Sequence, residues 1–171
     1  LDKIHFMNKK RLVVAFSGPS NSGKTTAIVK VSNILQDRGF KVCIIKHDPK
    51  DKAMFDRPGK DSFKFGETGA DVAVVSPNKT TLLKKQTSTI DEMIDLFDDF
   101  DYLLVEGLKT LDLPRISIFR NSLNEDYFKV TDAIASDDTI NDDDIPSTID
   151  RLNLNSPEDM IIWIDKNAKR V

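Results

Sequence analysis

The sequence predicts an α/β fold in which a mostly parallel sheet is covered by helices on both faces. Short apolar segments alternate with helical patterns along the 171 residues, as in sheets whose parallel strands are joined by crossover helices. The apolar run 12–16 also leads straight into a glycine-bounded loop and an amphipathic helix. With 39% apolar and 31% charged residues, the composition is that of a protein with one ordinary core. We expect one domain over residues 10–171 and, before it, an N-terminal extension over residues 1–9 that lies outside the fold.

The first half of the predicted domain alternates between strands and helices separated by turn signals. Apolar residues on one helical face follow the loop, and Gly39 ends that helix. After the turn at Pro77, β-branched residues and lysines indicate an exposed edge strand or hairpin. The predicted elements are a strand over residues 12–16, helices over 24–38 and 61–67, strands over 41–46 and 70–76, and the edge strand over 80–85.

The second half contains two helices with strong start signals. Thr89 and Glu92 have the spacing of a capping box, and Ser156 precedes Pro157 and two acidic residues. Three short apolar segments lie between these helices. We predict helices over residues 90–97 and 157–167 and strands over 102–106, 115–119 and 133–136.

The loop after the first strand has the G-x-x-x-x-G-K-T pattern of a phosphate-binding P-loop, or Walker A motif. Its glycines allow a tight turn and a close approach of the backbone to phosphate oxygens. The backbone amides then point inward at the positive end of the following helix. Lys24 is predicted to bind the β- and γ-phosphates, and the Thr25 hydroxyl to ligate Mg²⁺. The residues assigned to the phosphates are Gly18, Ser20, Asn21, Ser22, Gly23, Lys24, Thr25 and Thr26.

Residues at the carboxyl ends of the other strands are further candidates, because ligands of parallel sheets bind beyond those ends. Glu106 is predicted to hold Mg²⁺ opposite Thr25 or to orient a water, with a plain surface glutamate as the alternative. Lys46 and His47 end the second strand, where His47 is either a substrate contact or a structural residue. Asp137 follows a later strand and is a candidate for reading the nucleotide base.

The segment 56–62 places basic and acidic side chains around a Pro-Gly turn. Taken alone, it has the composition of a surface turn that caps the helix behind it. In a nucleotide site, Lys60 would meet a phosphate of a second substrate and Asp61 would assist the metal ion. Both interpretations are open at this point.

The composition argues against several classes of function. The formal net charge is −3 and no basic stretch is interleaved with aromatic residues, so a general nucleic-acid binder is not expected. No apolar stretch approaches the roughly 20 residues of a membrane span, and no signal-peptide pattern is present. We therefore expect a cytoplasmic protein that binds neither nucleic acid nor a membrane.

Together, these motifs resemble the MobB family, the GTP-binding adaptor proteins of molybdopterin-guanine dinucleotide synthesis. The resemblance rests on the phosphate loop, on Lys46-His47, on Gly59-Lys60-Asp61-Ser62 and on Val105-Glu106-Gly107. It extends over nearly the whole chain from about Lys10. The loop alone is shared by very many NTPases, whereas the combination is much more specific.

The resemblance implies a P-loop NTPase fold of the kinase–GTPase kind that binds GTP and Mg²⁺ and hydrolyses GTP weakly if at all. It further implies a role beside a MobA-type molybdenum cofactor guanylyltransferase, which joins GMP to molybdopterin, and a homodimer that pairs at an edge such as 80–85. The residues that it assigns to molybdopterin or nucleotide are Lys46, His47, Lys60 and Asp61. Many relatives have further histidines soon after the position of His47, where this chain has Asp48-Pro49-Lys50, so any pterin would be held differently here.

Two other classes of function compete with this one. A small-molecule or nucleotide kinase of the P-loop class would close an arginine-bearing lid over the phosphates, for which the candidates are Arg57, Arg115 and Arg120. A metallochaperone-type GTPase would need Cys and His ligands, and the chain has one Cys and two His. The scarcity of both residue sets favours an accessory GTP-binding protein.

Overall fold

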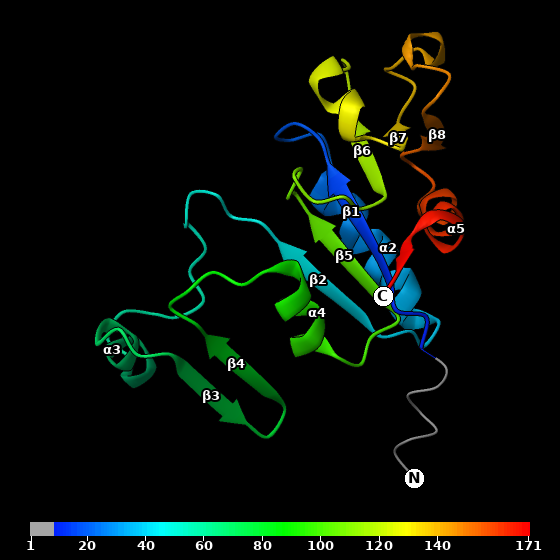
Figure 1. Cartoon of the computed structure of the whole chain (residues 1–171). Coiled ribbons are helices and arrows are strands. Elements are labelled where there is room, and N and C mark those ends of the chain that lie inside the picture. Colours follow the sequence, from blue (N-terminus) through cyan, green and yellow to red (C-terminus); the bar gives the residue numbers. More distant parts are fainter. Residues whose placement is uncertain (1–8) are drawn as a thin grey trace. The chain divides into compact units, whose positions relative to one another are not determined.

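The structure, a computed structural model, describes residues 9–171, which divide into two compact units (Figure 1). The first unit contains residues 9–47 and 99–171, and the second contains residues 48–98. Residues 1–8 of the expected N-terminal extension lie outside the described residues. Each unit is taken separately below.

The first unit is built on a sheet with the strand order β2-β5-β1-β6-β7-β8, in which every neighbouring pair is parallel. A short final strand, β9, pairs antiparallel with β1. The predicted α/β fold with a mostly parallel sheet is therefore confirmed. The strands are β1 (Leu12–Ser17), β2 (Val42–Lys46), β5 (Tyr102–Glu106), β6 (Arg115–Phe119), β7 (Ala133–Ser136), β8 (Asp150–Asn153) and β9 (Lys169–Arg170).

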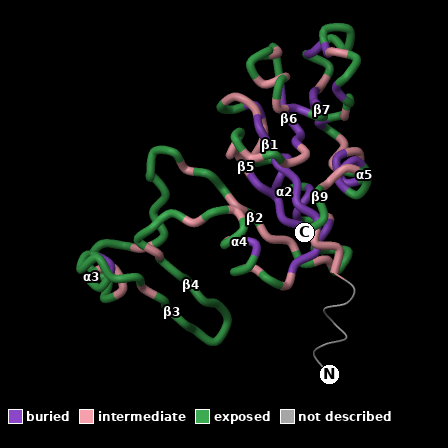
Figure 2. Tube along the Cα trace, viewed as in Figure 1, coloured by how far each residue is buried: buried purple, intermediate pink, exposed green. Residues whose placement is uncertain are grey.

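Helices α2 (Lys24–Asp37) and α5 (Pro157–Asn167) pack on one face of this sheet. Phe16 of β1 shares a fully buried core there with Val31 of α2 and Met160 of α5. Figure 2 shows the same concentration of buried residues along β1, β6 and β7. The buried strands thus give the loops at their carboxyl ends a rigid base.

The opposite face of β6 and β7 is covered by a second, smaller apolar cluster. Phe119 and Ile134 pack there with three isoleucines from the segment 140–149. This segment contains the 3₁₀ turn η2 (Asp142–Asp144), and another, η1 (Glu125–Val130), precedes β7. Alternation of side chains along β6 and β7 explains why each strand contributes to both clusters.

The second unit contains a two-stranded antiparallel sheet and two short helices. Strands β3 (Val72–Ser76) and β4 (Lys79–Leu83) form a hairpin whose second strand is fully exposed, which confirms the predicted edge hairpin. The helices are α3 (Asp61–Glu67) and α4 (Ile90–Phe97).

The predicted helix starts are confirmed in detail. At α4, the Thr89 side chain accepts from the Glu92 amide and the Glu92 side chain accepts from the Thr89 amide, which completes the capping box. At α5, the Ser156 side chain accepts from the Asp159 amide and Pro157 is the first helical residue. Local signals alone are sufficient for these ends, because both partners of each cap lie within one turn.

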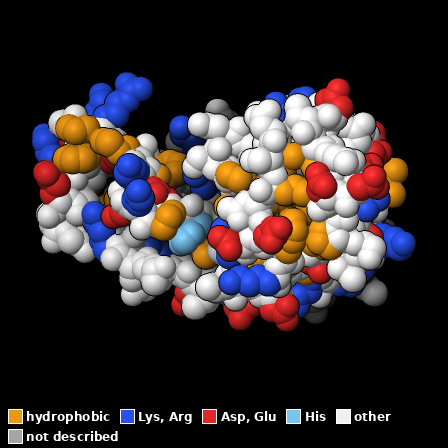
Figure 3. All heavy atoms as spheres, turned by 90° about the horizontal axis from the view of Figure 1, so that it is seen from above, with side chains coloured by type: hydrophobic (Ala, Val, Ile, Leu, Met, Phe, Trp, Pro, Cys, Tyr) orange, Lys and Arg blue, Asp and Glu red, His pale blue; other side chains and the backbone are white. Residues whose placement is uncertain are grey.

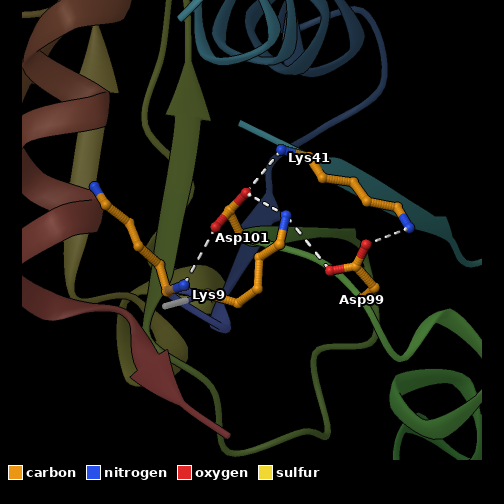
Figure 4. Close-up of polar contacts among 5 residues, drawn as sticks. Lys9, Lys41, Asp99 and Asp101 are labelled. Carbon is orange, nitrogen blue, oxygen red and sulfur yellow. Dashed lines mark hydrogen bonds and ion pairs between the residues drawn. The ribbon is translucent and has the colours of Figure 1, made fainter. Parts of the chain in front are cut away.

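A charged network holds the amino ends of the three neighbouring strands β2, β5 and β1 together (Figure 4). The nearly buried Asp101 carboxylate accepts from the Lys41 amide at 2.9 Å and pairs with the Lys9 ammonium at 3.4 Å. The Asp99 carboxylate pairs with the side-chain ammonium groups of both lysines, at 3.3 Å from Lys41 Nζ and 3.4 Å from Lys9 Nζ. These contacts fix the chain before β1, β2 and β5, and so the register in which their carboxyl ends meet.

Four elements of the first unit were not predicted from the sequence: β8, β9, η1 and η2. β8 is the polar sequence Asp-Arg-Leu-Asn and β9 has two residues, so neither shows an apolar alternation. Among the described residues, no helix combines the length and the apolar character needed to span a membrane.

Candidate nucleotide-binding site

The loop between β1 and α2 has the geometry that a phosphate-binding loop needs. Gly18, Asn21 and Gly23 all have positive φ angles, of 137°, 61° and 100°. A Cβ atom on Gly18 would lie 2.3 Å from the backbone oxygen of Ile118, so no other residue fits there. The two glycines of the motif are therefore required by the close approach of β6 and by the left-handed turn into α2.

The start of α2 is open to a ligand. Its N-cap residue is Gly23, no side chain caps it, and its first turn contains no acidic residue. The first backbone bond of the helix runs from the Ala27 amide to the Gly23 oxygen, so the amides of residues 24–26 precede the hydrogen-bonded ladder. The positive end of α2 therefore has unused donors, the arrangement that binds phosphate.

Two polar side chains of the loop fit an absent anion. Lys24 Nζ donates to the Pro19 backbone oxygen of its own loop at 2.6 Å, which keeps the ammonium over the loop. The Ser22 hydroxyl is buried and has no hydrogen-bond partner among the described residues. Buried polar groups are normally paired, so an unpaired hydroxyl inside this loop fits a ligand that supplies its partner.

The strand order brings the other candidates of the first unit to the same edge. Glu106 is in register with Phe16 of β1 on one side and with Lys46 of β2 on the other. The His47 amide donates to the Glu106 oxygen at 3.0 Å. A Cβ on Gly107 would lie 3.1 Å from the Cβ of His47. Glu106, Lys46 and His47 therefore lie together beside the strand that carries the phosphate loop.

This edge is open to solvent. Seen along the strands from their carboxyl ends, the surface carries charged side chains of both signs (Figure 3). Thr25 and Thr26 at the start of α2 are exposed, as are Lys46 and His47, whereas Glu106 is half-buried. The side chains assigned to metal and substrate are thus accessible to a ligand.

Arg115 was a candidate for a lid over the phosphates, and the structure gives it a different role. Its side chain is fully buried and donates to the Ser17 hydroxyl and to the backbone oxygens of Gly107, Leu108 and Leu111, at 2.8–3.2 Å. The idea that it belongs to a phosphate-covering lid is therefore wrong. Arg115 instead ties the loop after Glu106 to the last residue of β1.

Asp137 lies where β7 ends, at the rim of a cavity of about 560 Å³. The cavity lies beyond the ends of β7 and β8, the position that the sequence analysis gave to the base. Asp137 pairs with Arg120 Nε at 3.3 Å. The hydrogen bond from the Thr139 hydroxyl is the largest cause of the lowered pKa of Asp137. The positive charge of Arg120 lowers this pKa further. The cavity is lined by Ser136, Asp137, Asp138, Ile140, Asp142, Arg151, Leu152, Asn153 and Asn155.

Lys60 and Asp61 belong to the second unit. Lys60 is the N-cap residue of α3, and Asp61 is its first residue. Asp61 pairs with Lys64 at 3.6 Å, and both side chains are exposed. The helix expected behind the segment 56–62 is present, but its N-cap residue is Lys60 and no side chain caps it, so the expected cap is wrong. The assignment of Lys60 and Asp61 to the nucleotide site stays a prediction.

The cavity residues of β8 and the hydrogen bonds of Arg115 and Thr139 were not predicted from the sequence. The sequence did show Arg115 as a single charged residue at the start of the apolar run 115–119. A charged residue is unusual in a strand that is paired on both sides, as β6 is with β1 and β7. The β8 residues gave no such signal.

Comparisons with known proteins agree with this geometry. Residues 13–137 match the protein family described as "Molybdopterin guanine dinucleotide synthesis protein B", MobB. The molybdopterin-guanine dinucleotide biosynthesis adapter protein of Haemophilus influenzae is 30% identical over 128 residues, which are 72% of this chain and 71% of that protein. The adapter protein of the same name from Escherichia coli K12 is 32% identical over 116 residues, 64% of this chain and 66% of that protein.

Solved structures support the fold. The crystal structure of Bacillus subtilis MobB superposes with a TM-score of 0.74 at 23% identity, covering 90% of this chain and 97% of that one. A further crystal structure of a molybdopterin-guanine biosynthesis protein B has a TM-score of 0.68, also at 23% identity and with the same coverage. β1, the phosphate loop and α2 on a parallel sheet make this a P-loop NTPase fold, and with the family match over residues 13–137 the chain belongs to the MobB family.

Proposed function

We propose that this protein is a GTP-binding accessory protein of molybdenum cofactor biosynthesis. In this role it assists a MobA-type guanylyltransferase in attaching GMP to molybdopterin, in the cytoplasm. The observation that carries the proposal is the uncapped start of α2 behind Gly23, with Lys24 held over its own loop. Membership of the MobB family supplies the pathway.

In this proposal the loop residues 18–26 bind the phosphates of GTP. The amides at the start of α2 and the Lys24 ammonium neutralise the β- and γ-phosphates. Thr25 and Glu106 supply the oxygen ligands that Mg²⁺ prefers. When bound, Mg²⁺ would neutralise phosphate charge.

The second ligand is molybdopterin. Lys46 and His47 lie beside Glu106 at the carboxyl edge of the sheet, within reach of a ligand next to the phosphates. The base of GTP is assigned to the cavity beyond β7 and β8.

Hydrolysis is expected to be slow. The phosphate loop contains no glutamine to orient a water, and the buried Arg115 is committed to backbone oxygens. Fast GTPases and kinases use such groups to stabilise transition-state charge. The protein is therefore expected to present GTP and to leave the transfer to its partner enzyme.

Calorimetric titration with GTP and with ATP, each with and without Mg²⁺, tests the proposal. We expect Mg²⁺-dependent GTP binding, weak or absent ATP binding and little turnover. A preference for ATP would contradict the proposal and would favour a small-molecule or nucleotide kinase of the P-loop class. Absence of binding by either nucleotide would contradict both.

Glu106→Gln is expected to weaken the Mg²⁺-dependent part of GTP binding while leaving Mg²⁺-free binding unchanged. The amide keeps the size of the side chain but removes the charge that holds the cation. The measurement is the ratio of GTP affinities with and without Mg²⁺, with Glu125→Gln, an exposed glutamate of η1, as the matched control. An unchanged ratio in Glu106→Gln would make Glu106 a surface acid.

A homodimer is also proposed, with the hairpin of the second unit as the contact. Val75 of β3 is 76% exposed and every residue of β4 is exposed, so the hairpin offers apolar side chains together with a free strand edge. Val75→Glu is expected to yield monomers in sedimentation equilibrium, while Ile162→Glu on the exposed side of α5 leaves the dimer intact. A monomeric wild-type protein would contradict the proposal.

A further inference from the structure

Arg120 occupies an unusual place at the end of β6. A Cβ atom on Gly23 would lie 3.6 Å from Arg120 Nε and 3.7 Å from Cζ, so the guanidinium packs directly over the phosphate-loop residue that precedes Lys24. The Arg120 side chain is 43% exposed, and its only ion pair within the described residues is that with Asp137. Neither terminal nitrogen of Arg120 donates to a protein atom in that part of the chain.

A ring of contacts holds this guanidinium in place. Asp137 Oδ2 faces Arg120 Nε at 3.3 Å, while Oδ1 accepts from the amide and hydroxyl of Thr139. The Thr139 hydroxyl in turn accepts from the Asn121 amide at 2.8 Å. Both carboxylate oxygens of Asp137 therefore have partners within the protein. These contacts hold the carboxylate in place, and the carboxylate in turn orients the Arg120 side chain.

The strand order shows what Arg120 faces. The phosphate loop follows β1, and the cavity assigned to the base lies beyond β7 and β8. β6 is the strand between β1 and β7, and neighbouring strands lie about 4.8 Å apart. A nucleotide that reaches from the loop to the cavity must therefore cross the end of β6, where its α-phosphate and ribose would pass.

We propose that Arg120 binds the α-phosphate of the nucleotide and that Asp137 is the positioning residue that orients it. This inference rests on the proposed nucleotide binding and changes the expected role of Asp137 from reading the base to holding Arg120. The free terminal nitrogens of the guanidinium supply two donors side by side, which suit two oxygens of one phosphate.

The test is calorimetric titration of Arg120→Gln with GMP, GDP and GTP. All three contain the α-phosphate, so all three should bind about 10- to 100-fold more weakly than to wild type, by the same factor. A loss for GDP and GTP but not for GMP would place Arg120 at the β-phosphate and would overturn the proposal. Arg38→Gln, which removes the exposed partner of Glu158 at the far end of α2, is the matched control and should bind as wild type. Wild-type affinity in Arg120→Gln would overturn the proposal, as would a loss confined to GTP, because that would place Arg120 at the γ-phosphate.

Asp137→Asn separates a positioning role from base reading. If Asp137 acts by positioning Arg120, Asp137→Asn should weaken nucleotide binding in the wild-type background but not in the Arg120→Gln background. The effects of the two substitutions on affinity are then non-additive. A base-reading Asp137 would instead accept from the guanine amino group, and Asn there would favour xanthosine triphosphate, whose C2 carries an oxygen. A gain of xanthosine triphosphate binding in Asp137→Asn would overturn the positioning role.

The outcomes also separate this inference from the proposed function. If wild type binds no nucleotide, the proposed function fails and the inference fails with it. If wild type binds ADP and ATP instead, the same substitutions are titrated with those ligands, because the α-phosphate is common to both. If a nucleotide binds and Arg120→Gln does not change its affinity, only the inference fails. Thermal melting by circular dichroism confirms that each variant is folded.

Discussion

Lys24→Ala is expected to abolish GTP binding in calorimetry while leaving the protein folded. The ammonium is the only full positive charge inside the phosphate loop, and charge-assisted hydrogen bonds to phosphate are each worth about 1.5–3 kcal/mol. Loss of about 3 kcal/mol weakens binding more than 100-fold, which takes a micromolar ligand out of the measurable range. Because the hydrogen bond that the Lys24 ammonium makes among residues 9–171 is to a backbone oxygen of its own loop, folding should lose no more than about 1 kcal/mol.

Lys30→Ala is the control for this experiment. Lys30 is an exposed lysine on the same helix and makes no ion pair among the described residues. It should bind GTP as wild type does and melt at the same temperature. Retention of wild-type affinity by Lys24→Ala would refute the phosphate-loop assignment, whatever the family of the chain.

The elements that could be predicted from the sequence are those set by local interactions. The glycines at 18 and 23 follow from the backbone angles of the loop, and the Thr89 capping box involves two residues within one turn. The exposed hairpin was visible because β-branched and lysine residues follow a tight turn. The capping box and the hairpin are specified by residues that are neighbours in the chain. The loop glycines are visible within one short motif, although Gly18 is also required by the close approach of Ile118.

The features that were missed depend on contacts between distant segments. β8 is polar in sequence and becomes a strand only because β7 offers it a parallel partner. The partner of Asp137 Oδ2 is Arg120, 17 residues earlier in the chain, and it could not be read from the residues after β7. Position at a strand end was enough to nominate Asp137, but its role depends on its partner.

Arg115 also has a partner far away in the chain, Ser17 of β1, and its substitution is expected to have the largest effect on stability. Its guanidinium is fully buried and serves four acceptors, three of them backbone oxygens of the loop 107–111. Burial lowers the pKa of this guanidinium and Asp132 opposes the shift, but an arginine remains charged in a protein. Arg115→Ala would remove the side-chain donor from all four acceptors and open a cavity beside Ser17. The Leu108 and Leu111 oxygens would keep the Leu111 and Leu113 amides as donors, whereas the Gly107 oxygen would lose the side-chain donor that it has in the structure.

We therefore expect Arg115→Ala to lower the free energy of unfolding in urea by about 3–5 kcal/mol. Arg115→Lys should recover only part of the loss. The planar guanidinium reaches the four acceptors with two separate nitrogens, and a single ammonium cannot reach all four. Arg38→Ala, at an exposed ion pair, should cost less than about 1 kcal/mol and is the control. If Arg115→Ala were as stable as Arg38→Ala, the four hydrogen bonds would not order the loop. If the expected loss of stability is measured, Arg115 of β6 holds the loop after Glu106 against the last residue of β1, directly before the phosphate loop.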